Sequence, residues 1–239
     1  MKNNNKFRLD VWGAITLGTI ALYALFLLYP MAYLIRQSVL DPDTGSFTLA
    51  YFTKFFSKSY YFDTLINSFK VSITATVLSI AIGTPLAYLF TIFKIKGKSV
   101  LNILIVVASM SAPFIGAYSW ILLLGRSGII TTFFKNLGIA IPDIYGFGGI
   151  VLVMTLQLFP LVFLYAKGAL KNIDNSLIEA AENLGCSGIA CFFKVVVPLI
   201  MPTLLAAALL VFMRSFADFG TPMLIGEGYR TFPVVLYTE

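Results

Sequence analysis

Side chains that could do chemistry are scarce in this chain of 239 residues. It contains no histidine, and its two cysteines, Cys186 and Cys191, have a spacing that matches no metal or redox motif. Its apolar runs contain no paired carboxylates or thiolates, which a membrane-embedded enzyme would need for metal-dependent or acid–base chemistry. The sequence therefore predicts a protein that is not an enzyme, with no metal site and no cofactor bound by this chain.

Two ionisable residues, Arg214 and Asp218, fall at the end of an apolar run that begins near Pro198. They are four residues apart and so share one face of a helix. At a rise of 1.5 Å per residue they lie roughly 24 and 30 Å beyond Pro198, at the outer membrane interface. Two interpretations stay open: an ion pair that anchors the helix end, or a contact to a transported substrate.

A polar, Glu-rich island separates two apolar runs. Ser176 and Glu179 fit the S-x-x-E capping box that begins a helix, and Gly185 stands where a left-handed turn would end it. The apolar residues between them fall on one stripe at helical spacing: Leu177, Ile178, Ala181 and Leu184. The pattern predicts a short amphipathic helix, followed by a second helical stretch from about Ser187 into Pro198 and the next span.

The composition of the whole chain indicates the class of protein that contains these residues. Hydrophobic residues make up 59% of the sequence and charged residues only 12%, against about 25% charged in soluble domains. Apolar runs long enough to cross a bilayer are predicted to form a polytopic, all-α bundle of five full spans and the start of a sixth. The five runs are Val11–Ile35, Val71–Phe93, Val100–Gly125, Ile144–Ala166 and Val195–Met213.

Lysine and arginine near the span ends predict the orientation. The denser set comprises Lys2, Lys6, Arg8, Lys94, Lys96, Lys98, Lys167, Lys171 and Lys194. The sparser set comprises Arg36, Lys54, Lys58, Lys70, Arg126 and Lys135. The N-terminal tail, residues 1–10, is therefore expected in the cytoplasm, with the first span at 11–35. The segment 36–66 is expected outside the cytoplasm, with an interfacial helix. The net charge of +6 is mostly a topology signal, and no basic helix or aromatic-interleaved patch indicates nucleic acid.

Residues 179–198, EAAENLGCSGIACFFKVVVP, resemble the cytoplasmic signature of ABC-importer permeases: EAA, three residues, glycine, nine residues, then I-x-L-P. The matching positions are Glu179, Ala180, Ala181, Gly185, Val195, Val197 and Pro198. The resemblance implies a type I-like permease fold over 67–239, with a cytoplasmic coupling loop at about 168–197. It also implies that the short helix docks into a groove on a cytosolic ATPase. On spacing alone, a capped connecting helix on the membrane surface fits equally well.

Further stretches, above all SFADFGTPMLIGEGYRTFPVVLYTE, resemble the ferric-iron branch of these permeases, which neighbours polyamine, thiamine and phosphonate importers. The resemblance implies ferric iron as substrate, with those three classes as alternatives. Members of the branch usually carry two halves on one chain, each with an EAA loop. The final run TFPVVLYT is expected to feed a sixth span, so the chain is expected to be an N-terminal half.

The implied partners are a cytosolic ABC ATPase dimer that holds ATP and Mg²⁺, an extracytoplasmic substrate-binding protein, a second permease half and membrane lipid. The implied location is a bacterial or archaeal cytoplasmic membrane. A stand-alone channel or secondary transporter is a more remote alternative, since glycine and proline breaks could form an ion path. Such a protein usually carries a functional charge at mid-membrane, and its mechanism would not explain the Glu-rich island.

Overall fold

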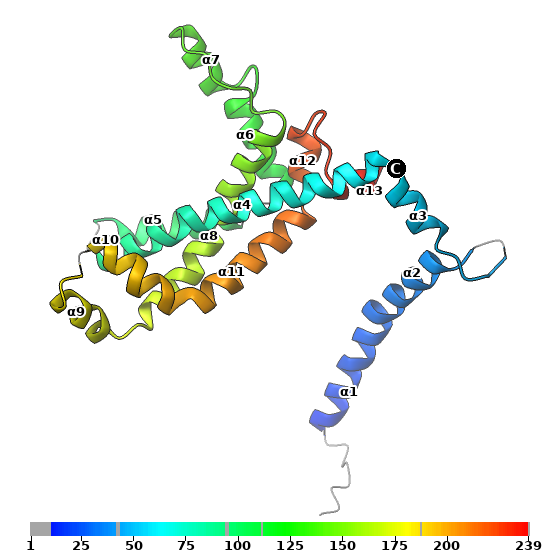
Figure 1. The fold of residues 1–239 in the computed structure, drawn as a ribbon, viewed down its shortest axis with the longest axis horizontal. Coiled ribbons are helices and arrows are strands. Elements are labelled where there is room, and N and C mark those ends of the chain that lie inside the picture. The colour runs from blue at the N-terminus through cyan, green and yellow to red at the C-terminus, as the bar shows by residue number, and fades with distance from the viewer. Residues whose placement is uncertain (1–10, 42–43, 94–95, 111, 187, 239) are drawn as a thin grey trace, which may run out of the picture. The chain divides into compact units, whose positions relative to one another are not determined.

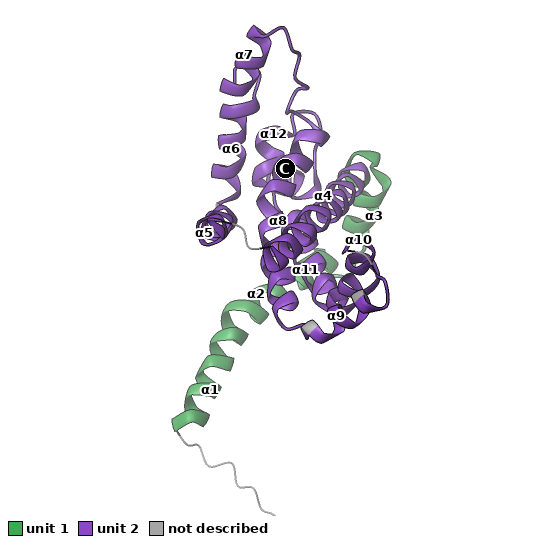
Figure 2. Cartoon of the chain, turned by 90° about the vertical axis from the view of Figure 1, so that its left-hand side faces the viewer, with its two compact units in different colours: residues 1–62 green, residues 63–239 purple. Residues whose placement is uncertain are grey.

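The computed structural model describes residues 11–41, 44–93, 96–110, 112–186 and 188–238. The predicted N-terminal tail, Lys94 and Ser187 lie outside these ranges. The described residues form helices and no strand, and they divide into two compact units, 1–62 and 63–239 (Figure 2). Within the described ranges, five helical stretches are long and apolar enough to cross a membrane, which confirms the all-helical, membrane-spanning fold class.

The first unit contains a helical stretch that runs through Val11–Val39. It consists of α1 (Val11–Tyr23), the π-helix η1 (Ala24–Leu28) and α2 (Tyr29–Val39), and is followed by α3 (Ala50–Ser57). The π-turn comes directly before Pro30, where Tyr29 N–H bonds to the carbonyl five residues back, of Ala24. A proline ring clashes with the carbonyl four residues back in a regular α-helix. The wider turn lets the stretch continue across the proline.

The second unit begins within α4 (Ser59–Ile92) and is built around α8 (Phe147–Lys171), which contacts α5, α6, α11 and α12. Figure 1 shows the arrangement. The remaining elements are α5 (Lys98–Ser109), α6 (Pro113–Leu124), α7 (Ile129–Asn136), α9 (Asn175–Asn183), α10 (Gly188–Cys191), η2 (Phe192–Val196), α11 (Val197–Ala217), α12 (Gly220–Ile225) and α13 (Phe232–Thr238).

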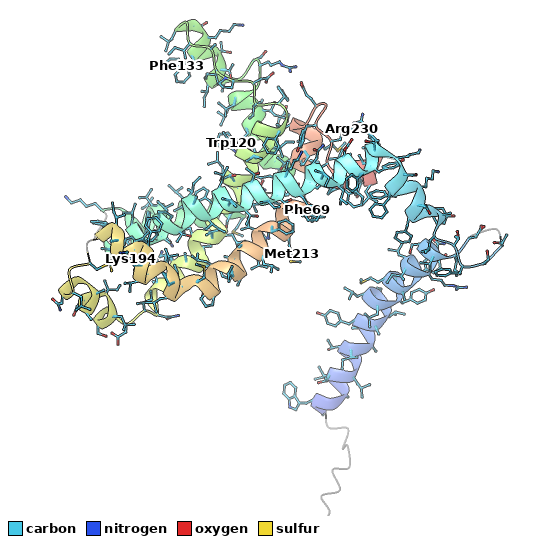
Figure 3. The ribbon with its side chains drawn as sticks, in the orientation of Figure 1. Phe69, Trp120, Phe133, Lys194, Met213 and Arg230 are labelled. Carbon is cyan, nitrogen blue, oxygen red and sulfur yellow. The ribbon has the colours of Figure 1, made fainter. Side chains whose placement is uncertain are left out.

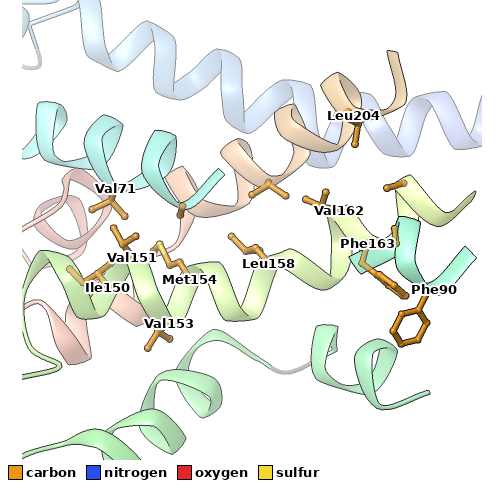
Figure 4. Packing of buried hydrophobic residues seen from close by; sticks show 14 of the residues in the cluster. Val71, Phe90, Ile150, Val151, Val153, Met154, Leu158, Val162, Phe163 and Leu204 are labelled. Carbon is orange, nitrogen blue, oxygen red and sulfur yellow. The ribbon is translucent and has the colours of Figure 1, made fainter. Parts of the chain in front are cut away.

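The core of this unit lies along α8. Ile150, Val153, Met154, Val162 and Phe163 are almost completely buried over four turns of this helix and Figure 4 shows them packed between neighbouring helices. Other side chains of the second unit remain exposed, as expected of helices whose outer faces meet lipid or another subunit. The central position of α8 therefore fixes where the other helices lie.

Helix α4 approaches α8 through a stripe of small residues. Ala75, Ser79, Gly83 and Ala87 recur every fourth position and are all buried. A Cβ atom at Gly83 would lie 2.8 Å from the Cβ of Val162 and 2.9 Å from the carbonyl oxygen of Phe159. Small residues permit such close backbone approach between membrane helices, where dispersion contacts replace the hydrophobic effect.

The third apolar run, predicted as one span over 100–125, is not one helix. Helix α5 ends at Ser109 and α6 begins at Pro113, with Ala112 extended at ψ 144°. The residue before a proline is disfavoured in the helical conformation, because the proline ring clashes with its backbone and Cβ. The predicted span was therefore wrong: α5 is a shorter apolar helix, and the third long stretch is Pro113–Asn136.

The small-residue contact can be tested at Gly83. We expect Gly83→Ala to destabilise the protein by about 1–3 kcal/mol, because the added methyl group overlaps α8. The midpoint of thermal unfolding in detergent measures the effect. Gly168→Ala is the matched control, since a Cβ there meets no atom within 4 Å. Equal midpoints for the two variants would contradict the close contact.

Candidate functional site

Helix α9 occupies the Glu-rich island and lies at one end of the second unit (Figure 1). It follows the end of α8 and contacts α10 and η2, which lead into α11. A turn at the end of α8 redirects the chain: Asn172 and Ile173 donate backbone hydrogen bonds to Ala169 and Leu170. The helix is therefore a separate piece joined to two long membrane helices, α8 and α11.

The N-terminal cap of α9 is Asp174, two residues earlier than the predicted Ser176. Ser176 N–H donates to Asp174 Oδ1 at 3.0 Å, so Ser176 lies inside the first turn. The pKa of Asp174 is lowered from its ordinary value because the backbone and hydroxyl of Ser176 donate hydrogen bonds to its carboxylate. The sequence offered two competent caps, Asp and Ser, and the preceding turn places Asp174 at the helix start.

The C-terminal end of α9 is closed at Gly185. This glycine adopts φ +85°, in the left-handed region, and a Cβ on it would meet no atom within 4 Å. Cys186 N–H bonds to the carbonyl of Ala181 at 3.0 Å, the six-to-one bond of a Schellman turn. Glycine is thus required here by backbone conformation and not by lack of space.

The predicted apolar stripe of α9 is partly buried against the core and partly exposed. Ile178 and Ala181 are half-buried, and Ile178 packs against the core. Leu177 and Leu184 are 49% and 89% exposed, and Ile189 at the start of α10 is 78% exposed. The end of the unit therefore presents apolar side chains that no other described part of this chain covers.

Two of the three EAA residues of α9 are also exposed, and Ala181 is half-buried. Glu179 and Ala180 are exposed, and the Glu179 side chain makes no hydrogen bond or ion pair within the described part of the chain. A capping box would also have the Glu179 carboxylate accept a hydrogen bond from the backbone N–H of the capping serine, and this bond is therefore not formed. A charged carboxylate, a small residue and neighbouring apolar side chains remain available to a partner surface.

The connection from α9 into the membrane passes through η2 and Pro198. Val197 N–H bonds to the carbonyl of Phe192, five residues back, and Pro198 stands in the first turn of α11. Phe192 is buried, and the centroid of its ring lies 4.7 Å from the ring centroid of Tyr88 in α4. The base of α11 is therefore held against α4 directly after the loop.

Arg214 and Asp218 lie toward the other end of α11, which Figure 3 shows at Met213, far along the helix from Lys194. Asp218 accepts hydrogen bonds from Gly220 N–H at 2.9 Å, Thr221 N–H at 3.3 Å and the Thr221 hydroxyl at 2.7 Å. Arg126, unlike Arg214, forms ion pairs, with Asp143 and Glu227. Of the two interpretations, the ion pair of Arg214 with Asp218 is not formed, and the carboxylate instead accepts hydrogen bonds at the start of α12.

A cavity of about 500 Å³ opens beside these two residues. It lies where two helical runs are interrupted, between α5 and α6 and between α11 and α12. The sequence prediction missed this cavity and its residue Gln157, although Pro113 signalled the first interruption. Its lining residues are Ser109, Pro113, Phe114, Gln157, Leu158, Arg214, Ala217, Asp218, Phe219 and Gly220.

Comparison with known proteins identifies the family. Residues 47–238 match the family described as binding-protein-dependent transport system inner membrane component. The chain belongs to this family. The match includes α9, Gly185 and both interrupted helical runs, so the matched region contains the Glu-rich helix and the cavity together.

The permease resembles curated relatives of two kinds. It is 28% identical over 220 residues to the putative ferric transport system permease FbpB 1 of Haemophilus influenzae, covering 91% of this chain and 34% of that protein. It is 29% identical over 232 residues to the spermidine/putrescine permease PotB of the same organism, covering 93% of this chain and 79% of that protein. The permease thus spans about a third of the ferric relative, and the two identities do not distinguish the substrates.

A solved structure shares the fold. A chain from a bacterial alginate ABC transporter, crystallised with an alginate pentasaccharide-bound periplasmic protein, superimposes with a TM-score of 0.74. The two chains are 16% identical, and the match covers 95% of the permease and 82% of the transporter chain. The likeness establishes the architecture of the permease.

Basic residues of the permease gather at the end that carries α9. Lys98, Lys167 and Lys171 line a cavity of about 350 Å³, where the Lys167 ammonium donates to Asn102 Oδ1. Lys194 lies in η2, close to the same end of the unit. Figures 1 and 3 show α5, α9 and Lys194 together at this end. This clustering is the pattern expected of a cytoplasmic face.

The cap of α9 can be tested at Asp174. Asp174→Ala removes the acceptor for Ser176 N–H, so we expect faster amide hydrogen exchange over residues 175–183. Asp174→Asn is the control and should exchange nearly as slowly as the wild type, because asparagine also caps helices. Because the folded-state pKa is lowered, the stabilisation is complete at neutral pH and is lost only as the pH falls through that lowered pKa. Unchanged exchange in Asp174→Ala would contradict the cap.

Proposed function

We propose that this permease forms part of the translocation path of an ABC importer and that α9 is its coupling helix. The observation that carries the proposal is the uncovered surface of α9. There Glu179, Ala180, Leu177 and Leu184 are exposed on a helix that is closed at both ends. A short rigid helix with uncovered apolar side chains suits a groove on another protein. The EAA pattern makes a cytosolic ABC ATPase the proposed partner.

Force from that ATPase would enter α11 through the turn at Gly185 and the short α10–η2 segment. Phe192 would carry the movement to α4 through its contact with Tyr88. Packed side chains tend to move as rigid units, and rigid-body movement of helices is the general basis of alternating access. Gly185 and Pro198 would set the angles at which the two helices meet.

The remaining partners follow from this mechanism. ATP and Mg²⁺ would be bound and hydrolysed on an ATPase dimer, so this chain would contribute no catalytic residue. An extracytoplasmic binding protein would deliver the substrate, and a second permease half would complete the path, either in a longer chain or as a separate subunit. The basic end with α9 would face the cytoplasm, with the N-terminus on the same side.

Ferric iron is the proposed substrate, on the resemblance of the segment 215–239 to ferric-type permeases and on the similarity to FbpB. Polyamine transport is the second candidate, because PotB is equally similar in sequence. Thiamine and phosphonate remain further alternatives within the same group of importers.

The coupling role can be tested at Gly185. We expect Gly185→Val to abolish ATP-driven uptake, because a β-branched residue is strained at φ +85° and the turn after α9 would change direction. Gly185→Asn should retain uptake, because asparagine tolerates the left-handed region. Uptake by the assembled transporter in liposomes, with membrane insertion checked separately, is the measurement. Normal uptake in an inserted Gly185→Val variant would refute the coupling assignment.

The substrate can be tested by competition. In cells that depend on this transporter, uptake of labelled ferric iron should be unaffected by a large excess of spermidine or thiamine. Inhibition by spermidine, together with uptake of labelled spermidine, would assign the permease to polyamine import instead. Inactivation of the partner ATPase is the control and should remove uptake of whichever substrate is carried.

A further inference from the structure

We infer that the cavity beside Arg214 binds an anionic oxygen group of the transported substrate. The inference rests on the proposed importer function and concerns the charge of what passes through. It assigns Arg214 as the residue that recognises a carboxylate or phosphate group. Ferric iron would then enter this cavity as a complex with an anionic ligand, and a free polyamine would be disfavoured.

Arg214 is a cation that nothing else in the described structure neutralises. Its guanidinium makes no ion pair, hydrogen bond or ring contact with another described residue. A guanidinium carries five donors in a planar fork that matches carboxylate and phosphate oxygens. Arg214 is exposed at the end of α11, where either water or a bound anion can solvate its charge. An anionic group in the cavity would supply a partner that no described residue supplies.

Asp218 does not fill this role, although it lines the same cavity. Its Oδ1 accepts two backbone N–H groups and its Oδ2 accepts the Thr221 hydroxyl. The carboxylate therefore satisfies the orphan amides at the start of α12. Among the described lining residues, the one acid is thus held by the protein itself, while the one cation, Arg214, is not.

The walls of the cavity are suited to a small ligand. The two helix interruptions meet there: the rings of Phe114 in α6 and Phe219 before α12 lie 5.0 Å apart, edge to face. Irregular backbone at membrane depth is tolerated where it lines a cavity or a path. A volume of about 500 Å³ falls within the range of small-molecule sites. Gln157 from α8 also lines the cavity.

The charge also bears on the choice between substrates. A polyamine would bring further positive charge toward Arg214, and like charges repel. The Asp218 carboxylate on the same cavity offsets part of this repulsion. A ferric complex with citrate, or a phosphonate, would bring oxygen anions instead. The cavity therefore favours the ferric and phosphonate branches, provided that the ferric ion is accompanied by its ligand.

The first test measures binding without transport. The assembled transporter is treated with phenylglyoxal, which modifies arginine, and mass spectrometry follows the modified fraction of Arg214. Citrate or inorganic phosphate should slow the modification severalfold, and spermidine should not. Arg36, in the other unit, is the internal control and should be modified at the same rate under all conditions. Equal modification of Arg214 with and without the anions would overturn the inference.

The second test measures transport. Arg214→Gln should lower the initial rate of ferric citrate uptake by about tenfold, the expected effect of losing charge-assisted hydrogen bonds. Lys135→Gln is the matched control, because it removes one positive charge from α7, away from the cavity. Wild-type rates in Arg214→Gln would refute the inference. Loss of the second permease half from purified Arg214→Gln would assign Arg214 to the subunit interface and would also refute it.

The two proposals fail in different ways. If the wild-type transporter shows no ATP-driven uptake of any candidate, the proposed function fails, while arginine modification still decides whether anions bind. If uptake is normal and depends on Gly185 but anions do not protect Arg214, the proposed importer function is supported and the anion site is refuted.

Discussion

Backbone hydrogen bonding in a medium without water is the constraint on which this structure depends. Every N–H and C=O group at membrane depth needs a partner within the protein, so the chain runs in long helices packed around α8. The small-residue stripe of α4 lets two of these helices approach until Gly83 lies against the backbone of α8. Interruptions of a helix are then permitted only where something else satisfies the freed groups.

The two interruptions that line the cavity meet this condition in different ways. Between α5 and α6, Pro113 contributes no N–H group, which removes one donor that would otherwise need a partner. Between α11 and α12, Asp218 accepts the amides of Gly220 and Thr221. The side chain that looked like half of an ion pair is therefore a structural cap, and Arg214 is left facing the cavity.

Helix α11 joins the two sites. Its base follows Gly185 and η2 and is held to α4 by Phe192, and its far end carries Arg214 and leads into Asp218. A movement of α9 is thus connected through packed elements to the wall of the cavity. The proposed importer function would need this connection, because ATP hydrolysis on one side of the membrane would have to change access to a site within it.

The sequence by itself determined the class of the protein and the ends of α9 to within two residues. Apolar runs of spanning length require helices in a bilayer, and only glycine readily adopts the left-handed turn at position 185, so both features are local. Tertiary structure decided which cap closes α9 and which partner Asp218 takes. Asp174 and Ser176 are both close enough in sequence to cap α9, and Arg214 and the first amides of α12 are both close enough in sequence to pair with Asp218. The choice depended on how the chain turns after α8 and α11, which neighbouring residues in the sequence do not encode.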